Sequence, residues 1–149
     1  MKLLDANFNP ATGGSFAVVE NKGEKFLGFA KCHPDDMAEA SKFAGCGYAE
    51  TRAIIKALKE ERRKEKEQCE ILRKFVKAVT QYKDFDNTSR EARAMFRQLN
   101  RRIKKVNALT EEINKEMQNL EAAIAQRDIV KRAIKRRRDR RAEEINPTL

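Results

Sequence analysis

The feature that most constrains this chain is a stripe of mostly apolar residues in its second half, spaced alternately three and four residues apart. The stripe consists of Phe96, Leu99, Ile103, Val106, Thr110, Ile113, Met117, Leu120 and Ile124. Such a spacing, kept over about four heptads, predicts a long helix whose apolar edge packs against another helix. The partner helix comes either from the first half of the chain or from a second copy of the chain, and we favour the dimer.

The first half contains a matching helical pattern from about residue 48 to about residue 82. Its apolar register is carried by Ile55, Leu58, Cys69, Leu72, Val76 and Val79. Arg62 and Glu65 interrupt this register within the charged run 60–67, which is predicted to face solvent and to be the weak point of the packing. Gly45 and Gly47 are expected to delay the start of the helix.

A short connection at residues 83–87 separates the two helical patterns. It is followed by Thr88-Ser89-Arg90-Glu91, which has the T-x-x-E spacing of a capping box. Long helices joined by so few residues are predicted to be antiparallel neighbours. At about 1.5 Å per residue, a second helix of about 55 residues outruns a first helix of about 35 by about 30 Å. Its C-terminal end is therefore expected beside the N-terminal part of the chain.

The N-terminal part has a β pattern. Two apolar runs, 15–20 and 25–31, flank Asn21-Lys22-Gly23-Glu24 and predict a β-hairpin. Residues 1–14 are predicted to be an arm or an irregular lead-in. Because two strands alone are marginal, the hairpin should pack on a helix or on a third strand, from Leu3-Leu4 or from a second copy. After the hairpin, Pro34 is predicted to end the second strand, and Asp35 or Asp36 to cap the segment that follows.

The predicted fold class is therefore mainly α with a small β part. An N-terminal β-hairpin packs on a helix, and a long antiparallel helical hairpin, a coiled coil with a basic C-terminal helix end, follows. The predicted division places the N-terminal arm and β-hairpin module in residues 1–47 and the two-helix coiled coil with its basic tail in residues 48–149.

Charge is distributed unevenly along the chain. The 149 residues carry a formal net charge of +10, but residues 1–50 hold five basic and seven acidic residues, which leaves +12 for residues 51–149. With 38% charged and 7% aromatic residues, little remains for a deep globular core. An anionic partner is therefore expected to meet the helices.

The densest positive charge is the run 131–141, with eight Lys or Arg residues and one Asp. The predicted partner-binding residues are Lys131, Arg132, Lys135, Arg136, Arg137, Arg138, Arg140 and Arg141, with Arg101 and Arg102 in a second basic segment. Lys and Arg release counterions from nucleic acid, which gives strong, salt-dependent affinity for phosphates. Few aromatic residues lie among them, so base stacking is not predicted there. The alternative is a solvated helix end that serves only solubility.

Catalytic and cofactor motifs are not recognisable in the sequence. His33 is the only histidine, and a structural role at a strand end is favoured over a catalytic pair with Cys32. Gly13-Gly14 and Gly45-Cys46-Gly47 lack the residues of phosphate-binding loops and are expected to serve turns or close backbone approach. The chain is predicted to be no enzyme and to use no cofactor or metal, and its three cysteines are expected to be free thiols.

The start of the chain is not that of a signal peptide, and no apolar stretch has the length of a membrane span. A soluble protein of the cytoplasm, without a membrane partner, is therefore expected.

Residues 28–58 carry two linked patterns. The first is G-x-A-x-x-x-P-x-D, from Gly28 to Asp36, and the second is G-x-x-x-A-x-x-R-A-x-x-x-x-L, from Gly45 to Leu58. The residues that carry the resemblance are those from Gly28 to Asp36 and those from Gly47 to Leu58. They cover about a fifth of the chain and resemble a module of small bacteriophage and bacterial proteins. That module is similar to the second half of a double-stranded-RNA-binding domain, in which hairpin strands pack on a helix. The resemblance implies a hairpin-plus-helix fold, a phage or prophage origin and an affinity for RNA.

Small phage proteins with a compact module, a helical extension and no active site often inhibit host defence, as anti-CRISPR proteins do. By this analogy we expect a non-catalytic phage accessory protein in the cytoplasm of a bacterial host cell. It would bind a host protein or ribonucleoprotein complex, or RNA or DNA, through the basic helix end, as a stoichiometric inhibitor of a defence system such as CRISPR-Cas. The alternatives are a self-associating coiled-coil structural or assembly protein, such as a homodimer, and a general RNA- or DNA-binding protein.

Overall fold

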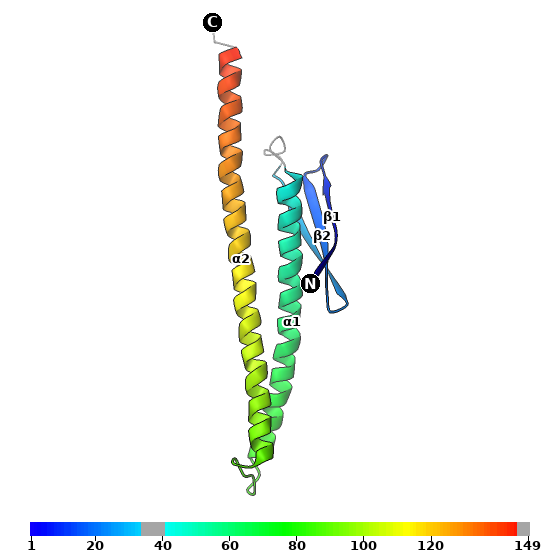
Figure 1. Cartoon of the computed structure of the whole chain (residues 1–149), viewed down its shortest axis with the longest axis vertical. Helices are drawn as coiled ribbons and strands as arrows, with labels where there is room; N and C mark the ends of the chain where they lie inside the picture. The colour runs from blue at the N-terminus through cyan, green and yellow to red at the C-terminus, as the bar shows by residue number, and fades with distance from the viewer. Residues whose placement is uncertain (34–40, 146–149) are drawn as a thin grey trace. The chain divides into compact units, whose positions relative to one another are not determined.

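The computed structural model describes residues 1–33 and 41–145 of the chain (Figure 1). Its elements are the strands β1 (Lys2–Asn9), β2 (Gly14–Asn21) and β3 (Glu24–Lys31) and the helices α1 (Lys42–Thr80) and α2 (Arg90–Ile145). The predicted fold class, mainly α with a small β part, is confirmed. The positions predicted to end the second strand and to cap the next segment, Pro34, Asp35 and Asp36, lie outside the described residues.

The chain divides into two compact units, and both helices contribute to each. The sheet unit consists of Met1–Ala57 and Glu116–Leu149, and the helical-hairpin unit consists of Leu58–Lys115. The β-strands thus share a unit with the first turns of α1 and with the C-terminal part of α2.

The sheet is antiparallel, with strand order β1-β2-β3. The predicted hairpin is confirmed: Asn21 pairs with Glu24, and a two-residue turn, Lys22-Gly23, joins β2 to β3. Both turn residues have positive φ, 53° and 82°, which is the backbone of the hairpin turn that matches the twist of the strands. Glycine adopts this conformation without steric cost.

The N-terminal residues form a strand, so the prediction of an irregular arm was wrong. β1 pairs with β2 along its length, and Leu3-Leu4 supply the third strand from the same chain. A register shift between Leu3 and Asp5 breaks the two-residue alternation, which is why the strand pattern was not recognised. A turn follows in which Asn9 O accepts the amide of Gly13 at 2.8 Å, so the chain returns along β1.

α1 begins at Lys42, earlier than predicted, because Ser41 caps it and its first turns pack on the sheet. The amide of Ala44 donates to Ser41 Oγ at 3.3 Å. Gly45 lies inside the helix, and a Cβ there would come within 2.2 Å of Ser15 Oγ. Glycine therefore lets α1 approach Ser15 closely at this position and does not delay the helix.

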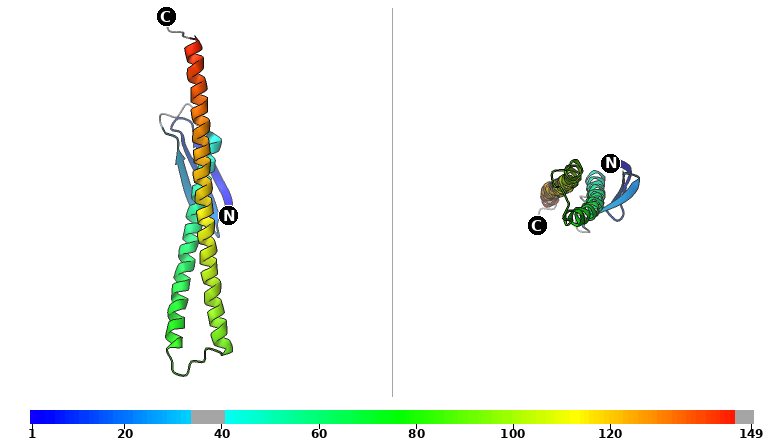
Figure 2. Two further views of the ribbon diagram at one scale, coloured as in Figure 1. Left: turned by 90° about the vertical axis from the view of Figure 1, so that its left-hand side faces the viewer. Right: turned by 90° about the horizontal axis from the view of Figure 1, so that it is seen from below.

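The core of the sheet unit consists of small residues. Ala17, Ala30 and Ala49 form its centre, and Ala53 is completely buried. A Cβ at Gly28 of β3 would lie 1.9 Å from Ala49 O and 2.6 Å from Ala53 N. The backbone of α1 thus contacts the backbone of the sheet directly, and Figures 1 and 2 show these first turns lying along one face of the strands.

Two cations of α1 cover the free edge of β3. Arg52 Nη1 donates to Phe29 O and Lys56 Nζ donates to Leu27 O, each at 2.6 Å. An open strand edge offers unpaired carbonyls to other chains. Because two of these carbonyls already accept hydrogen bonds, this edge is protected from pairing with another strand.

We expect Gly28→Ala to destabilise the sheet unit by about 3 kcal/mol, because the added methyl group overlaps backbone atoms that cannot yield. Gly47→Ala is the matched control. Nothing lies within 4 Å of a Cβ there, so the helix should gain about 0.5–1 kcal/mol. Hydrogen exchange of the β2 amides should be faster in the first variant and no faster in the second. Equal rates in both would contradict the close packing.

The helical-hairpin unit is antiparallel, as predicted. Leu72, Phe75 and Val79 of α1 line one groove together with Ala92 and Met95 of α2. The buried side chains of this unit are those of Leu58, Cys69, Val76, Ala92, Leu109 and Ile113. Cys69 and Val76 belong to the apolar register predicted for the first helix, whereas, among the described residues, Ile113 is the one buried residue of α2 in this unit that belongs to the predicted stripe.

α2 begins one residue later than the predicted capping box. Ser89 Oγ accepts the amide of Ala92 at 3.1 Å and is the N-cap. Thr88 instead donates its hydroxyl to Asp86 Oδ1 at 2.7 Å, in the connection. The capping box was therefore placed one residue too early, because two adjacent hydroxyl residues were both suited to the role.

The charged middle of α1 does not face solvent as a whole. Glu65, whose side chain is 15% exposed, accepts hydrogen bonds from Arg102 at 3.1 Å and Lys105 at 2.6 Å. Arg62 donates to Thr110 Oγ1 at 3.4 Å. The prediction that Arg62 and Glu65 face solvent was wrong, since they pair with polar groups of α2 at the interface between the helices.

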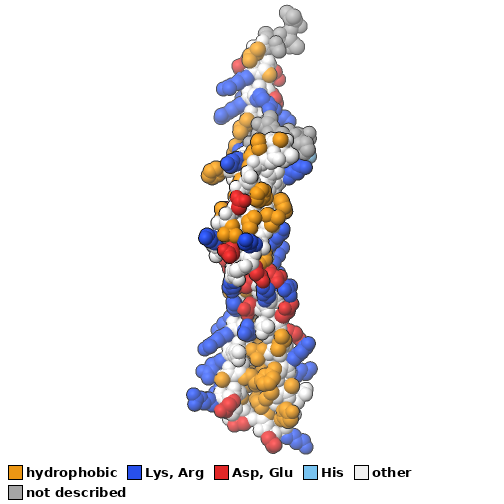
Figure 3. All heavy atoms as spheres, turned by 90° about the vertical axis from the view of Figure 1, so that its right-hand side faces the viewer, with side chains coloured by type: hydrophobic (Ala, Val, Ile, Leu, Met, Phe, Trp, Pro, Cys, Tyr) orange, Lys and Arg blue, Asp and Glu red, His pale blue; other side chains and the backbone are white. Residues whose placement is uncertain are grey.

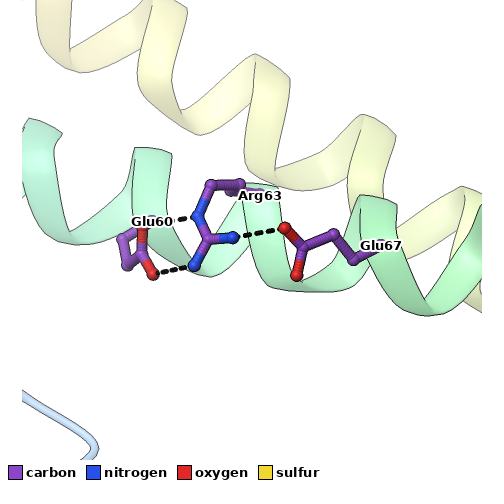
Figure 4. A network of polar contacts seen from close by, with 3 residues as sticks. All are labelled: Glu60, Arg63 and Glu67. Atoms are coloured by element: carbon purple, nitrogen blue, oxygen red, sulfur yellow. Dashed lines mark hydrogen bonds and ion pairs between the residues drawn. The ribbon is translucent and has the colours of Figure 1, made fainter.

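The neighbouring charges do lie on the surface. Arg63 binds both carboxylate oxygens of Glu60, at 2.9 and 2.6 Å, and also Glu67 one turn further along α1 (Figure 4). This hydrogen bonding lowers the pKa of Glu60 and raises that of Arg63. This network therefore pairs charges within α1. Arg62 and Glu65, in contrast, form hydrogen bonds with α2.

Glu65 should make the helical-hairpin unit sensitive to acid. The hydrogen bond from Lys105, followed by the charges of Lys105 and Arg102, lowers its pKa below the usual 4.5. A lowered carboxyl pKa stabilises the fold above the unfolded value, and that stability is lost as the pH falls through the folded value. Glu65→Gln should cost roughly 1–2 kcal/mol at pH 7 and reduce the loss of stability below about pH 4.5.

Urea unfolding followed by circular dichroism at several pH values measures this effect. Glu70→Gln removes the same charge from a side chain that is 54% exposed and pairs with Arg73 over 3.9 Å, so it should change little. Parallel pH profiles for the wild type and Glu65→Gln would refute the role of Glu65.

Candidate nucleic-acid interface

The basic helix end, residues 131–141, lies within α2 and belongs to the sheet unit. Lys131 is half-buried, and all the residues from Arg132 to Ile145 are exposed. At about 100° per residue, eight cations over about three turns point in every direction around the helix axis. The segment therefore presents cationic side chains to solvent on all sides of a continuous helix.

The start of this segment is held against the sheet. Arg127 and Lys131 line a small cavity of about 60 Å³ with Phe8, Cys32 and Tyr48. Of these two cations, only Lys131 belongs to the basic helix end, so the prediction that this end lies beside the N-terminal part of the chain is confirmed for Lys131. Beyond Lys131, the C-terminal part of α2 continues past the first turn of α1 in both views of this unit (Figures 1 and 2).

Tyr48 joins α1 to α2 within the sheet unit. Its hydroxyl donates to Ala123 O at 3.2 Å. Burial raises the pKa of this phenol, while the nearby charge of Arg127 lowers it and that of Asp128 raises it. The hydroxyl is thus neutral at physiological pH and acts as a hydrogen-bond donor that fixes α2 two turns before the basic helix end.

Arg101 and Arg102, the second predicted basic segment, belong to the helical-hairpin unit. Arg101 is exposed, whereas Arg102 is half-buried and donates to Glu65. The structure gives Arg102 a role in packing the two helices, which the charge pattern did not indicate. Partner binding by the predicted cations as a group stays a prediction.

The outer face of the sheet, which sequence reasoning did not single out, also carries exposed side chains. Strand pairing places Asn7, Phe16 and Phe29 side by side in one cross-strand row of this face. Phe29 is 58% exposed. β2 carries apolar side chains on both of its faces. Its sequence therefore lacks the alternation of apolar and polar residues that would have indicated which face has no helix covering it.

Other candidate chemistry is sparse among the described residues. In residues 1–33 and 41–145, no three His, Cys, Asp or Glu side chains lie close enough together to hold a metal ion. Cys32, Cys46 and Cys69 form no disulfide with one another, and His33 is exposed. In the same part of the chain, neither helix has an apolar stretch that could cross a membrane.

Comparison of the chain with protein-family models, with curated protein sequences and with solved structures finds no match. The resemblance to a phage module and to a double-stranded-RNA-binding domain therefore stays a prediction.

Replacing Tyr48 with Phe should lower the free energy of unfolding by about 1 kcal/mol, because the carbonyl of Ala123 loses its hydroxyl donor. Tyr82→Phe removes the same hydroxyl from a side chain that is 74% exposed and should change stability by less than about 0.5 kcal/mol. Thermal unfolding followed by circular dichroism compares the two variants. An equal effect of both would show that the hydrogen bond does not hold α2.

Proposed function

We propose that this chain is a non-catalytic binding protein whose basic helix end contacts the phosphates of nucleic acid, either bare or within a host ribonucleoprotein. The observation that carries the proposal is the exposure of seven of the eight cations, Arg132 to Arg141, on a continuous helix. A solvated face that served only solubility would not need a net charge of +7 within eleven residues.

The dimensions of the segment suit a groove bordered by phosphates. Eleven helical residues span about 16 Å, and duplex DNA carries one charge per about 1.7 Å of its axis. Cations on all sides of a helix can contact both backbones that flank a groove wide enough to admit the helix. Such contacts carry no sequence information, so the binding should be governed by charge.

The more specific form of the proposal concerns the target. A small protein can inhibit a nucleoprotein without catalysis, by covering the surface through which the nucleoprotein binds phosphates or the surface on which its own phosphates are exposed. The target class is a host defence complex such as CRISPR-Cas in the bacterial cytoplasm, bound in a fixed ratio.

Self-association is the second candidate, and exposed apolar side chains in the helical-hairpin unit favour it. Ile71 and Phe75 are 62% and 56% exposed, and Phe75 lines an open groove of about 720 Å³ with Met95. A structural or assembly protein would use this surface to form oligomers without nucleic acid.

Affinity purification of the tagged protein from a bacterial lysate, with and without nuclease, separates these functions. One ribonucleoprotein retained in a fixed ratio supports the inhibitor form of the proposal. Bulk nucleic acid that is lost on nuclease treatment supports a general binder. Recovery of the chain alone, as an oligomer, would contradict the proposal and favour self-association.

A charge-matched pair of variants tests the basic helix end directly. Changing Arg136, Arg137, Arg138, Arg140 and Arg141 to Gln takes the formal net charge from +10 to +5. Changing Lys59, Lys66, Lys74, Lys77 and Lys83 to Gln gives the same net charge from exposed positions elsewhere. The first variant should bind a DNA or RNA duplex about a hundredfold more weakly at moderate salt, and the second should lose far less.

Fluorescence anisotropy with a labelled duplex measures both affinities, and circular dichroism checks that both variants remain folded. Equal losses would mean that net charge alone drives binding, which would remove the basic helix end from the mechanism.

A further inference from the structure

The outer face of the sheet has a groove beside its aromatic pair. Asn7, Phe16 and Phe29 form one cross-strand row, and Asn9, Gly14 and Lys31 form the next. Gly14 has no side chain, which leaves space beside Phe16. A groove of about 800 Å³ lies at these rows, and Asn7, Asn9, Phe16, Phe29, Lys31 and Arg52 are among the residues that line it.

Of the two aromatic side chains, Phe16 is partly buried and Phe29 is exposed. A cross-strand pair of aromatics stabilises a sheet by contact with its neighbours. The opposite face of the same strands is covered by α1, through Ala17 and Ala30. Phe29 nevertheless leaves 58% of its surface exposed. Figure 3 views the sheet unit from this side and shows hydrophobic side chains gathered over it, with charged side chains at their borders.

The charge around the groove is positive. Lys31 and Arg52 line it, and none of the described residues that line it is acidic. The acidic residues of this face, Asp5 and Glu20, lie in the cross-strand rows further from the groove. Arg52 Nη1 donates to Phe29 O at 2.6 Å, which holds the guanidinium at the edge of the strand that carries the exposed ring.

We propose that this groove binds single-stranded nucleic acid by stacking its bases on Phe29 and Phe16. Paired aromatics on an exposed sheet face offer flat surfaces to unstacked bases, which a duplex cannot present. Asn7 Oδ1 and Asn9 Oδ1 accept the backbone amides of Phe8 and Ala11, which leaves the two side-chain NH2 groups to donate to base edges. Lys31 and Arg52 would contact phosphates. The inference rests on the proposed function in taking nucleic acid as the partner, and it adds a second site for a single strand.

A tryptophan reporter tests stacking directly, because the chain contains no tryptophan. In Phe29→Trp, a single-stranded oligothymidylate of about 12 nucleotides should quench the indole fluorescence in a saturable way. Phe43→Trp is the control, since Phe43 is 94% exposed and does not line the groove. It should give no saturable quenching, and a duplex of the same length should quench neither variant.

Affinity provides the second measurement. Phe29→Leu keeps an apolar side chain but removes the ring, and it should weaken oligothymidylate binding about tenfold while leaving duplex binding unchanged. Phe43→Leu should change neither. Equal quenching in both tryptophan variants, or unchanged single-strand affinity in Phe29→Leu, would overturn the proposal.

The experiments can contradict one proposed binding site without contradicting the other. Loss of duplex binding in the basic helix end variant, with quenching at Phe29→Trp retained, counts against the site of the proposed function alone. Duplex binding without quenching counts against the groove alone. If the emission of Phe29→Trp shifts with protein concentration and does not respond to the oligonucleotide, the groove binds a second copy of the chain and the inference is wrong.

Discussion

The close approach of α1 to the sheet is the constraint on which the sheet unit depends. Gly28 lacks a side chain where the backbones of β3 and α1 meet, and Gly45 lacks one where α1 meets the side chain of Ser15. Ala49 and Ala53 are completely buried between α1 and the sheet. This approach brings Arg52 to the carbonyl of Phe29 and directs Tyr48 toward α2. The packing therefore positions a cation at the groove and a hydrogen-bond donor two turns before the basic helix end.

The helical-hairpin unit is built on a different balance of forces. Its buried apolar residues are few, and the middle of the interface is joined by Glu65 with Arg102 and Lys105. Partly buried ion pairs contribute less than apolar packing but impose a register, because a shifted helix would leave the charges unpaired. Arg102 and Lys105 serve the packing of this unit, while the cations of the basic helix end from Arg132 to Arg141 are exposed.

Sequence reasoning found the helices, the β2–β3 hairpin and the antiparallel connection, because each has a regular period or a recognisable turn. It missed β1, whose bulge between Leu3 and Asp5 breaks the alternation, and the helical role of Gly45, which depends on contact with Ser15. The basic helix end could be identified directly from the sequence, because eight Lys or Arg residues lie within residues 131–141. The aromatic pair could not, because Phe16 and Phe29 become neighbours only through strand pairing.

We propose that the basic helix end binds nucleic acid through phosphate contacts. The salt dependence of duplex binding by the wild-type chain tests it most directly, because each phosphate neutralised contributes to the slope of log affinity against log salt concentration. Engagement of four to eight phosphates gives a slope between about −4 and −7. A slope near zero would mean that charge does not drive the interaction and would contradict the account.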